Sequence, residues 1–460
     1  MTDRDDGGDS CGGTGASRRR VLAGAASASI ATALAGCSFS LGGSGYDRAA
    51  LSEVAEGPDP SRPATHPVEI DEAMIADHRE HARDHLEQVS DDPSLPNGVV
   101  ADELASNRER VAETLRVQGP SDADGGEPSD DGSGSGETDD RSAEHRLHDA
   151  RDVRADAADL HFQYLAATGD VTERELERLR DDARDRLAGF RRAWAYRAPS
   201  PTRALLVHAL FEGLVERVEV DLAPWPRFPD DPLAGWREVG HLRGKVATAD
   251  ALLDDLDAYR EQVATADAGR YRPALAAAAM WLSRRANRVE YRDDRALEDG
   301  RAGLSTDPGD SVAGYGFDVA REYLREYSKR AFNDVQHDSQ YARTALFAAK
   351  RRAAVDAFAA AVDDAESSGG SVDVSASTVA DERTRAVDAI EQTLDAGPTG
   401  LQRRLLEPAY VALRDGDGEL RTGRNSDPRR AFAVYRYVAR YADAATRASE
   451  ELVGLLRAAE

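Results

Sequence analysis

The sequence predicts an all-α protein whose body is a multi-helix, bundle-like assembly with two irregular loops. From residue 143 onward, apolar residues recur every three or four positions, which is the spacing of helices that bury one face. No segment of convincing length alternates apolar and polar residues as a half-buried strand does. Proline and glycine gather in a few stretches, and these stretches divide the periodic pattern into separate helices.

The order of these patterns predicts five regions along the chain. They are a signal peptide (1–36), a lipidated flexible tether (37–67), a helical pair (68–118), a disordered acidic Gly/Ser linker (119–142) and a helical body (143–460). The tether is rich in glycine and proline and shows little periodicity. The linker contains almost only Gly, Ser, Asp and Glu, so it has too little apolar surface to offset the entropy of ordering.

The body divides into helices at recognisable start and stop signals. Thr172 and Glu175 form a capping-box pattern ahead of a helix that runs to about residue 194. Pro199 ends that helix, and Pro201 stands at the first position of the next one. Four prolines exclude a helix from the first irregular loop, at 222–236.

The second irregular loop is the glycine-rich stretch 300–316, and a long uninterrupted segment follows it. Residues 317–366 contain neither proline nor glycine. One straight helix of that length would span about 75 Å, which is longer than a compact body needs. We therefore predict a bend within the polar run 333–340. Further helices are expected at roughly 378–395, 400–414 and 428–459.

The charge balance is strongly acidic, with a formal net charge of -26 from 59 basic and 85 acidic side chains. Only three of the basic residues are lysine, and the acidic, arginine-rich, alanine-rich composition resembles that of proteins from extremely halophilic archaea. At molar salt the Debye length is about 3 Å, so such charge mainly keeps the surface hydrated. Because no basic stripe is present to neutralise phosphates, nucleic acid is not an expected partner.

The N-terminal 37 residues carry the clearest motifs in the chain. Three arginines, Arg18 to Arg20, precede the uncharged apolar run 21–34. Fourteen helical residues rise about 21 Å, which is less than the roughly 30 Å hydrocarbon core, so a permanent membrane span is not expected. This layout is that of a secretory signal. The segment SRRRVL at 17–22 resembles the twin-arginine export motif, and LAGC at 34–37 resembles the lipobox of bacterial and archaeal lipoproteins.

The resemblance to twin-arginine-exported lipoproteins covers residues 1–37 and implies a subcellular location. Arg18 and Arg19 would direct export of the folded protein, cleavage would precede Cys37, and a lipid would be attached to the Cys37 sulfur. The implied location is the extracytoplasmic side of the cell membrane, with the membrane as one partner and a cell-surface protein as a candidate second partner. Cys11 would leave with the signal, so no thiol would remain for a disulfide.

Three histidines are the candidate metal ligands, and a divalent ion there is the one cofactor that the sequence suggests. His78, His81 and His85 lie at i, i+3 and i+7 of a predicted helix, broadly on one face. Neighbouring pairs have the spacing to chelate zinc or copper, although the outer two are separated by about 10.5 Å of rise. The alternative interpretation is that all three are solvated. The spacing also differs from the His-Glu-x-x-His motif of zinc peptidases.

The proline-rich loop contains the candidate contact residues Trp225, Phe228 and Trp236. Aromatic anchors are favoured at binding hot spots, and prolines hold a loop rigid. The alternative is that these rings fold back and cap the bundle.

Two polar groups are further candidates for a site. The first is a polar pocket at the predicted bend, formed by Asn333, Gln336, His337 and Gln340. The alternative is that these side chains only form hydrogen bonds with one another where the helix bends. The second lies on an apolar helix, where His208, Glu212 and Glu216 follow one another at one-turn intervals. That row is either a buried acid-base pair or metal face, or the polar border of a packed helix.

After Cys37 the sequence contains no phosphate-binding Gly-rich loop followed by Lys and Ser or Thr, no Gly-x-Ser-x-Gly elbow and no dinucleotide fingerprint. The leading hypothesis is therefore a membrane-anchored extracytoplasmic helical lipoprotein that binds or scaffolds, without covalent chemistry. Two alternatives stay open. One is a metal-binding protein or metal-dependent hydrolase that uses the histidines, and the other is a helical receptor for a small solute.

Overall fold

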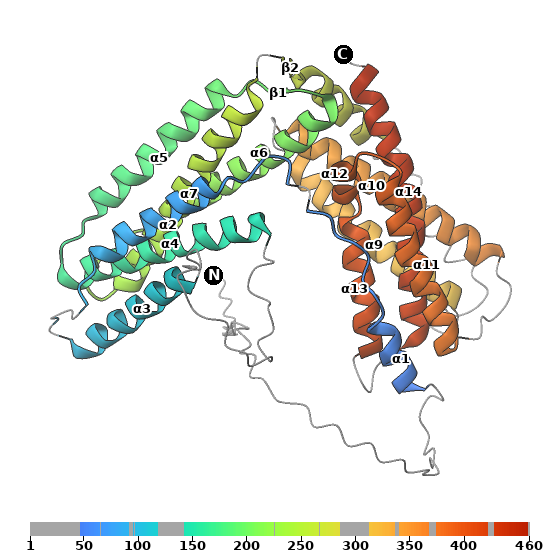
Figure 1. The fold of residues 1–460 in the computed structure, drawn as a ribbon, viewed down its shortest axis with the longest axis horizontal. Helices are drawn as coiled ribbons and strands as arrows, with labels where there is room; N and C mark the ends of the chain where they lie inside the picture. Colours follow the sequence, from blue (N-terminus) through green and yellow to red (C-terminus); the bar gives the residue numbers. More distant parts are fainter. Residues whose placement is uncertain are drawn as a thin grey trace, which may run out of the picture. The chain divides into compact units, whose positions relative to one another are not determined.

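The computed structural model describes residues 47–64, 66–91, 95, 97–117, 142–224, 226–265, 267–285, 312–335, 340–367, 374–421 and 427–458. Within these ranges the protein is helical almost throughout, which confirms the predicted all-α class (Figure 1). The helices with complete bounds are α1 (Arg48–Ala55), α2 (Glu72–Glu87), α3 (Gly98–Val117), α4 (Ala143–Thr168), α5 (Glu173–Ala193), α6 (Pro201–Asp221), α7 (Trp236–Val263), α9 (Val312–Val335), α10 (Tyr341–Ser367), α11 (Ala376–Asp395), α12 (Thr399–Leu405), α13 (Glu407–Arg421) and α14 (Pro428–Ala458). Residues 272–285 are also helical.

Helices α2 to α7 form the first bundle, which is organised around α4 and α7. Helix α7 packs along α4 and also contacts α5 and α6, whereas α2 and α3 pack on α4. A close approach of α4 to α7 is possible because α7 has glycines one turn apart. A Cβ atom at Gly240 would overlap Asp159 of α4, and one at Gly244 would lie 3.2 Å from the Asp159 Cβ. The predicted helical pair corresponds to α2 and α3, which contact each other.

Local signals in the sequence place the ends of α5 and α6. Thr172 precedes α5 and its side chain accepts a hydrogen bond from the Glu175 backbone N–H, as the capping pattern predicts. Ser200 caps α6 in the same way, and Pro201 occupies the first helical turn. Between these helices a two-residue strand, β1 (Arg197–Ala198), pairs antiparallel with β2 (Gly269–Arg270). Arg197 lies opposite Arg270 in this short ribbon.

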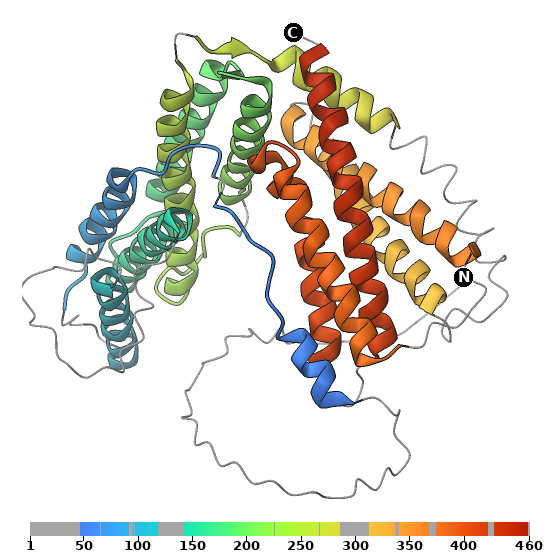
Figure 2. The same cartoon turned by 45° about the vertical axis from the view of Figure 1, so that its right-hand side comes forward.

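Helices α9 to α14 form the second bundle, and α14 is its central element. Figure 2 shows α14 (red) with helices of this bundle on both sides, and it contacts α9, α10, α11, α12 and α13. Three fully buried tyrosines, Tyr435, Tyr437 and Tyr441, point to different sides of α14, as expected for a helix that is surrounded by others. The expected break in the long segment 317–366 is confirmed, because α9 ends at Val335, α10 begins at Tyr341 and the two helices pack against each other.

Residues 47–64, which we call the strap, lie against the second bundle, although the sequence predicts them to be part of the tether. Helix α1 buries Leu51 and Ala55 and contacts α11 and α13. Beyond α1 the extended backbone is bound through its carbonyl groups. Arg383 donates hydrogen bonds to the Gly57 and Pro58 carbonyl oxygens at 3.0 and 2.9 Å, and the Tyr410 hydroxyl donates to that of Ser61 at 2.8 Å.

Several predicted regions lie outside the described residues. These are the signal peptide, Cys37 and the tether up to residue 46, nearly all of the acidic linker, and the second irregular loop up to residue 311. Across the ranges that the structure does describe, no helix combines the length and the apolar character that a membrane crossing requires.

We predict that the strap opens more readily when the Tyr410 hydroxyl is removed. A Tyr410→Phe variant loses the bond to the Ser61 carbonyl, and one such bond contributes about 0.5–1.5 kcal/mol. Amide hydrogen exchange at Ser61 and Arg62 should therefore be about 2- to 12-fold faster. Tyr164→Phe on the partly exposed face of α4 is the matched control and should leave those amides unchanged.

Candidate functional site

The candidate site is a groove of about 450 Å³ between α2 and α7, with α4 beneath it. Carboxylates and histidines supply most of the polar lining. The lining residues are Met74, Asp77, His78, Glu80, His81, Asp84, Arg154, Asp254, Asp255, Asp257 and Ala258. Six of these side chains are acidic, so the groove concentrates negative charge that originates from two separate helices.

The α2 side of the groove presents unpaired carboxylates. Asp77, Glu80 and Asp84 lie at i, i+3 and i+7, which places them along one face of the helix. All three are exposed, and none forms an ion pair with a residue that the structure describes. His81 lies among them and is exposed as well. Like charges at this spacing repel one another, so the α2 face is an electrostatically unfavourable row that a bound cation would relieve.

The α7 side of the groove is neutralised from below by arginines. Asp254 accepts hydrogen bonds from Arg154 at 2.7 Å and from Arg186 at 2.6 Å. Burial alone would raise the pKa of Asp254, but these two guanidinium groups hold it below its usual value. Asp257 forms a longer ion pair with Arg186, at 3.9 Å. The α7 carboxylates are therefore held in fixed positions, whereas those of α2 remain available.

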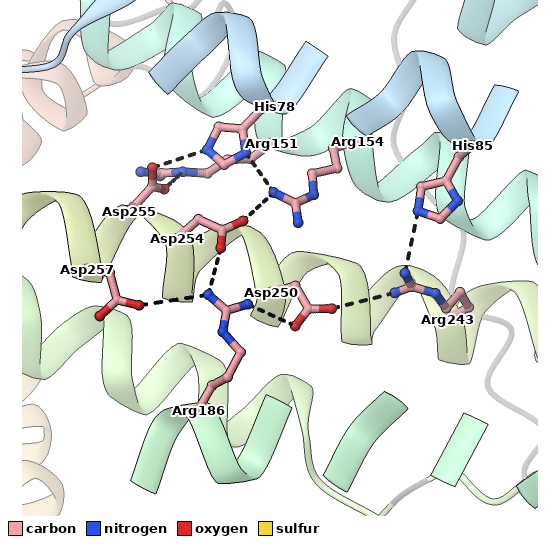
Figure 3. A network of polar contacts seen from close by, with 10 residues as sticks. All are labelled: His78, His85, Arg151, Arg154, Arg186, Arg243, Asp250, Asp254, Asp255 and Asp257. Carbon is pink, nitrogen blue, oxygen red and sulfur yellow. Dashed lines mark hydrogen bonds and ion pairs between the residues drawn. The ribbon is translucent and has the colours of Figure 1, made fainter. Parts of the chain in front are cut away.

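The floor of the groove is a buried network of polar contacts that joins α2, α4, α5 and α7 (Figure 3). Asp255 is 1% exposed, contacts Arg151 of α4 and lies 3.1 Å from Nε2 of His78. Arg154 lies 3.1 Å from Nδ1 of the same ring. Since a guanidinium group can only donate, Nδ1 must be the acceptor and Nε2 must carry the proton that Asp255 accepts. This arrangement fixes one neutral tautomer of His78.

His85 and His161 form a pair of neutral rings further along α2 and α4. Arg243 lies 3.4 Å from Nε2 of His85, and the two Nδ1 atoms of His85 and His161 are 3.1 Å apart. Because Nε2 of His85 faces a donor, its Nδ1 carries the proton and His161 accepts it. Burial first, and then the charge of Arg243, lower the pKa of His85 to about 3 and that of His161 to about 4. Both rings therefore stay neutral at physiological pH.

The three histidines predicted as metal ligands are thus placed in different surroundings. His78 and His85 contact α4 and α7, and both ring nitrogens of each are engaged by protein groups. Only His81 extends into the groove with an exposed ring. Throughout the described part of the chain, no set of three or more His, Cys, Asp or Glu side chains has the arrangement of a metal site. The i, i+3, i+7 spacing does not predict which of the three rings faces α4 and α7 and which faces the groove.

The aromatic loop contributes to the core of the first bundle. Trp236 is the first residue of α7 and is 6% exposed, and Phe228 is partly buried against the same apolar clusters. These positions correspond to the alternative in which the rings cap the bundle. Trp225 lies outside the described residues.

The predicted polar pocket at the bend is described only at one end. Gln336 and His337 lie outside the described residues, and Asn333 belongs to the last turns of α9. Gln340 is 8% exposed, and its side-chain oxygen accepts a hydrogen bond from Arg343 at 2.9 Å.

The row on α6 proves to be buried. His208 and Glu212 are each 1% exposed, whereas Glu216 reaches Arg343 at the edge. The Trp194 indole donates to His208 Nδ1 at 3.0 Å, so His208 Nε2 carries a proton and donates to the Arg197 carbonyl at 3.1 Å. Burial lowers the pKa of His208 to about 4. This ring is a neutral structural link and has no free nitrogen for a metal ion.

Glu212 is engaged on both sides. The Tyr196 hydroxyl donates to Oε1 at 2.9 Å, and the Ala342 and Arg343 backbone N–H groups donate at 3.0 and 2.7 Å. Burial raises the pKa of Glu212 to about 7, although these hydrogen bonds act in the opposite direction. Sequence spacing pointed to this row but could not identify the partners of Glu212, of which Ala342 and Arg343 lie about 130 residues further along the chain.

Two family models match the chain, and neither carries an activity. Residues 73–269 match a model described as Domain of unknown function (DUF8262), and residues 272–454 match one described as Domain of unknown function (DUF8264). Comparisons with curated proteins and with solved structures give no match. The two matched segments meet at strand β2, directly before the helix 272–285. The candidate groove lies entirely within the first segment.

We predict that the neutral histidine pair makes the protein sensitive to acid. An unfolded histidine has a pKa of about 6.5, and the folded pKa of His161 is lower, so the unfolded chain binds more protons below pH 6.5. The free energy of unfolding should therefore fall as the pH decreases from about 6.5 towards 4.

A His161→Asn variant tests this prediction, with urea unfolding measured at pH 7.5 and pH 5.0. The acid-induced loss of unfolding free energy should be smaller than in the unsubstituted protein by about 2 kcal/mol. His148→Asn is the control, because the His148 side chain is 65% exposed. An equal pH response of His161→Asn and the unsubstituted protein would contradict the assignment of a depressed pKa.

Proposed function

We propose that this protein is a lipid-anchored, extracytoplasmic binding protein and that the α2–α7 groove is its ligand site. The address rests on the twin-arginine and lipobox motifs that end at Cys37. The binding role rests on one observation, namely a groove of about 450 Å³ whose α2 side carries three unpaired carboxylates. The ligand class that fits these charges is a positively charged group.

The buried residues at the floor of the groove have a structural role. The buried residues at the floor of the groove, His78 and Asp255, are fully engaged with Arg154 and Arg151. A general base needs a ring nitrogen or a carboxylate oxygen that can reach the substrate, and His78 offers neither nitrogen in this arrangement. Instead the network holds the α7 carboxylates in place and offsets their charge, so the negative charge available to a cation comes from the α2 side.

The carboxylates on the two sides have complementary roles in this proposal. Asp254 and Asp257 are held by Arg186, so they set the position of the negative charge. Asp77, Glu80 and Asp84 on α2 carry the charge that is not neutralised by a described partner. A ligand with two or more spaced positive charges would contact both sides. Its affinity should fall as the salt concentration rises, because exposed charges are screened within about a Debye length.

The proposed location at the membrane predicts how variants of the protein distribute among cell fractions. Cys37→Ser removes the sulfur that would carry the lipid, so the protein should appear outside the membrane fraction. Arg18→Lys with Arg19→Lys removes the twin-arginine pair, so uncleaved precursor should accumulate inside the cell. Immunoblots of membrane, soluble and culture-medium fractions provide the measurement. Unchanged fractionation of both variants would rule out the lipid-anchored address.

The proposed ligand class is tested by titration calorimetry with spermidine, a trivalent cation, over a series of KCl concentrations. The variant Asp77→Asn, Glu80→Gln, Asp84→Asn should bind at least about tenfold more weakly and should show a shallower dependence on salt. The matched control is Glu173→Gln, Glu177→Gln, Asp185→Asn, which removes the same charge from exposed positions on α5. Equal loss of affinity in the two variants would show that only the net charge matters, and the groove would then not be the site.

A further inference from the structure

Among the described residues, no side chain of the segment that precedes α10 caps the start of this helix. The first backbone N–H groups of a helix have no partner within the helix, and Ser, Thr, Asp or Asn at the preceding position normally binds one of them. Here the preceding residue is Gln340, and its side-chain oxygen accepts from the Arg343 side chain instead. Ala342 is 0% exposed, so its N–H group cannot turn to water.

Glu212 of α6 supplies the missing acceptor from outside the helix. Its Oε1 atom accepts from the Ala342 N–H at 3.0 Å, and its Oε2 atom accepts from the Arg343 N–H at 2.7 Å. A carboxyl group that accepts from two N–H groups of a helix start acts as an N-cap, and its negative charge also suits the positive end of the helix dipole. This cap is therefore delivered by a residue about 130 positions earlier in the sequence.

The orientation of Glu212 is fixed by its own bundle. The Tyr196 hydroxyl donates to Oε1 at 2.9 Å, and the Tyr196 ring stacks on Trp194 with centroids 4.7 Å apart and planes inclined by 8°. Trp194 in turn donates to His208, one helical turn before Glu212 on α6. Tyr196 adopts a φ of 49°, which is uncommon for a residue other than glycine. The stack and the two hydrogen bonds hold this chain of residues in one arrangement.

We infer that Glu212 is a latch between the two segments matched by separate family models, and that the start of α10 is folded only while Glu212 is held by Tyr196. Residues 194–212 lie in the first matched segment, and α10 lies in the second. The inference concerns the coupling of the two segments and does not depend on the ligand or the address proposed above. It predicts that the N-terminal turn of α10 opens when the contact between Tyr196 and Glu212 is lost, while α4 and α7 stay protected.

Amide hydrogen exchange in the full chain tests the latch. Glu212→Ala removes both acceptors, so exchange at Ala342 and Arg343 should become about 2- to 30-fold faster, the range measured for the loss of an N-cap. Glu212→Gln keeps one acceptor oxygen and should give a smaller increase, which also provides a variant with less risk of misfolding. Glu216→Gln is the matched control, because Glu216 contacts only the side chain of Arg343 among the described hydrogen-bond partners. It should change these rates less than twofold.

A Tyr196→Phe variant tests whether Glu212 caps α10 only when Tyr196 holds it, or caps the helix independently of Tyr196. If Tyr196 holds Glu212 in place, Tyr196→Phe should speed exchange at Ala342 and Arg343 although it touches neither group. The effects of Tyr196→Phe and Glu212→Gln should then be less than additive. Unchanged exchange at α10 in Glu212→Ala would overturn the inference. A uniform increase over α4, α7 and α10 would also overturn it, because that result indicates global destabilisation without a local latch.

Discussion

The contact between α4 and α7 is the constraint on which the first bundle and its groove depend. Glycines at 240 and 244 let the two backbones approach closely beside Asp159, so the side chains of α4 can reach across α7. Arg151 and Arg154 then meet Asp255 and Asp254 one helix away. Helix α2 packs on α4 and places His78 over the same carboxylates. The position of the groove is thus a consequence of how closely these two helices pack.

Buried ion pairs disfavour alternative positions of the packed helices. Removing one partner of a buried ion pair costs about 3–5 kcal/mol, even where the intact pair adds little net stability. Asp255 and Arg383 are both buried and each has partners from other segments, so a shifted helix would leave a charge unpaired. Arginine suits this role because its fork of donors can satisfy two acceptors at once, as Arg383 does with Asp417 and the strap carbonyls. The arginine-rich composition therefore has a structural use in addition to surface hydration.

The features that could be predicted from the sequence are those set within a few residues. Thr172 and Pro201 mark helix starts because caps and first-turn prolines are local. The break near Gln340 is visible as a polar run in an apolar helix. The direction of each histidine ring was not predictable, because His78 turns towards Asp255, 177 positions away. Glu212 shows the same limit, since its spacing marks it as unusual but two of its three hydrogen-bond donors, Ala342 and Arg343, belong to the other bundle. Helix α1 was missed because eight residues give too few turns for a periodic pattern.

The strap also imposes an order on biosynthesis. Its docking site is formed by α11 and α13, and the contact between Ser61 and Glu391 joins residues 330 positions apart. A ribosome adds about 5–20 residues per second, so roughly 16 to 66 seconds separate the synthesis of Ser61 from that of Glu391. Docking of the strap therefore requires that α11 and α13 have already folded. This contact joins the start of the described chain to its C-terminal third, so it forms late in synthesis.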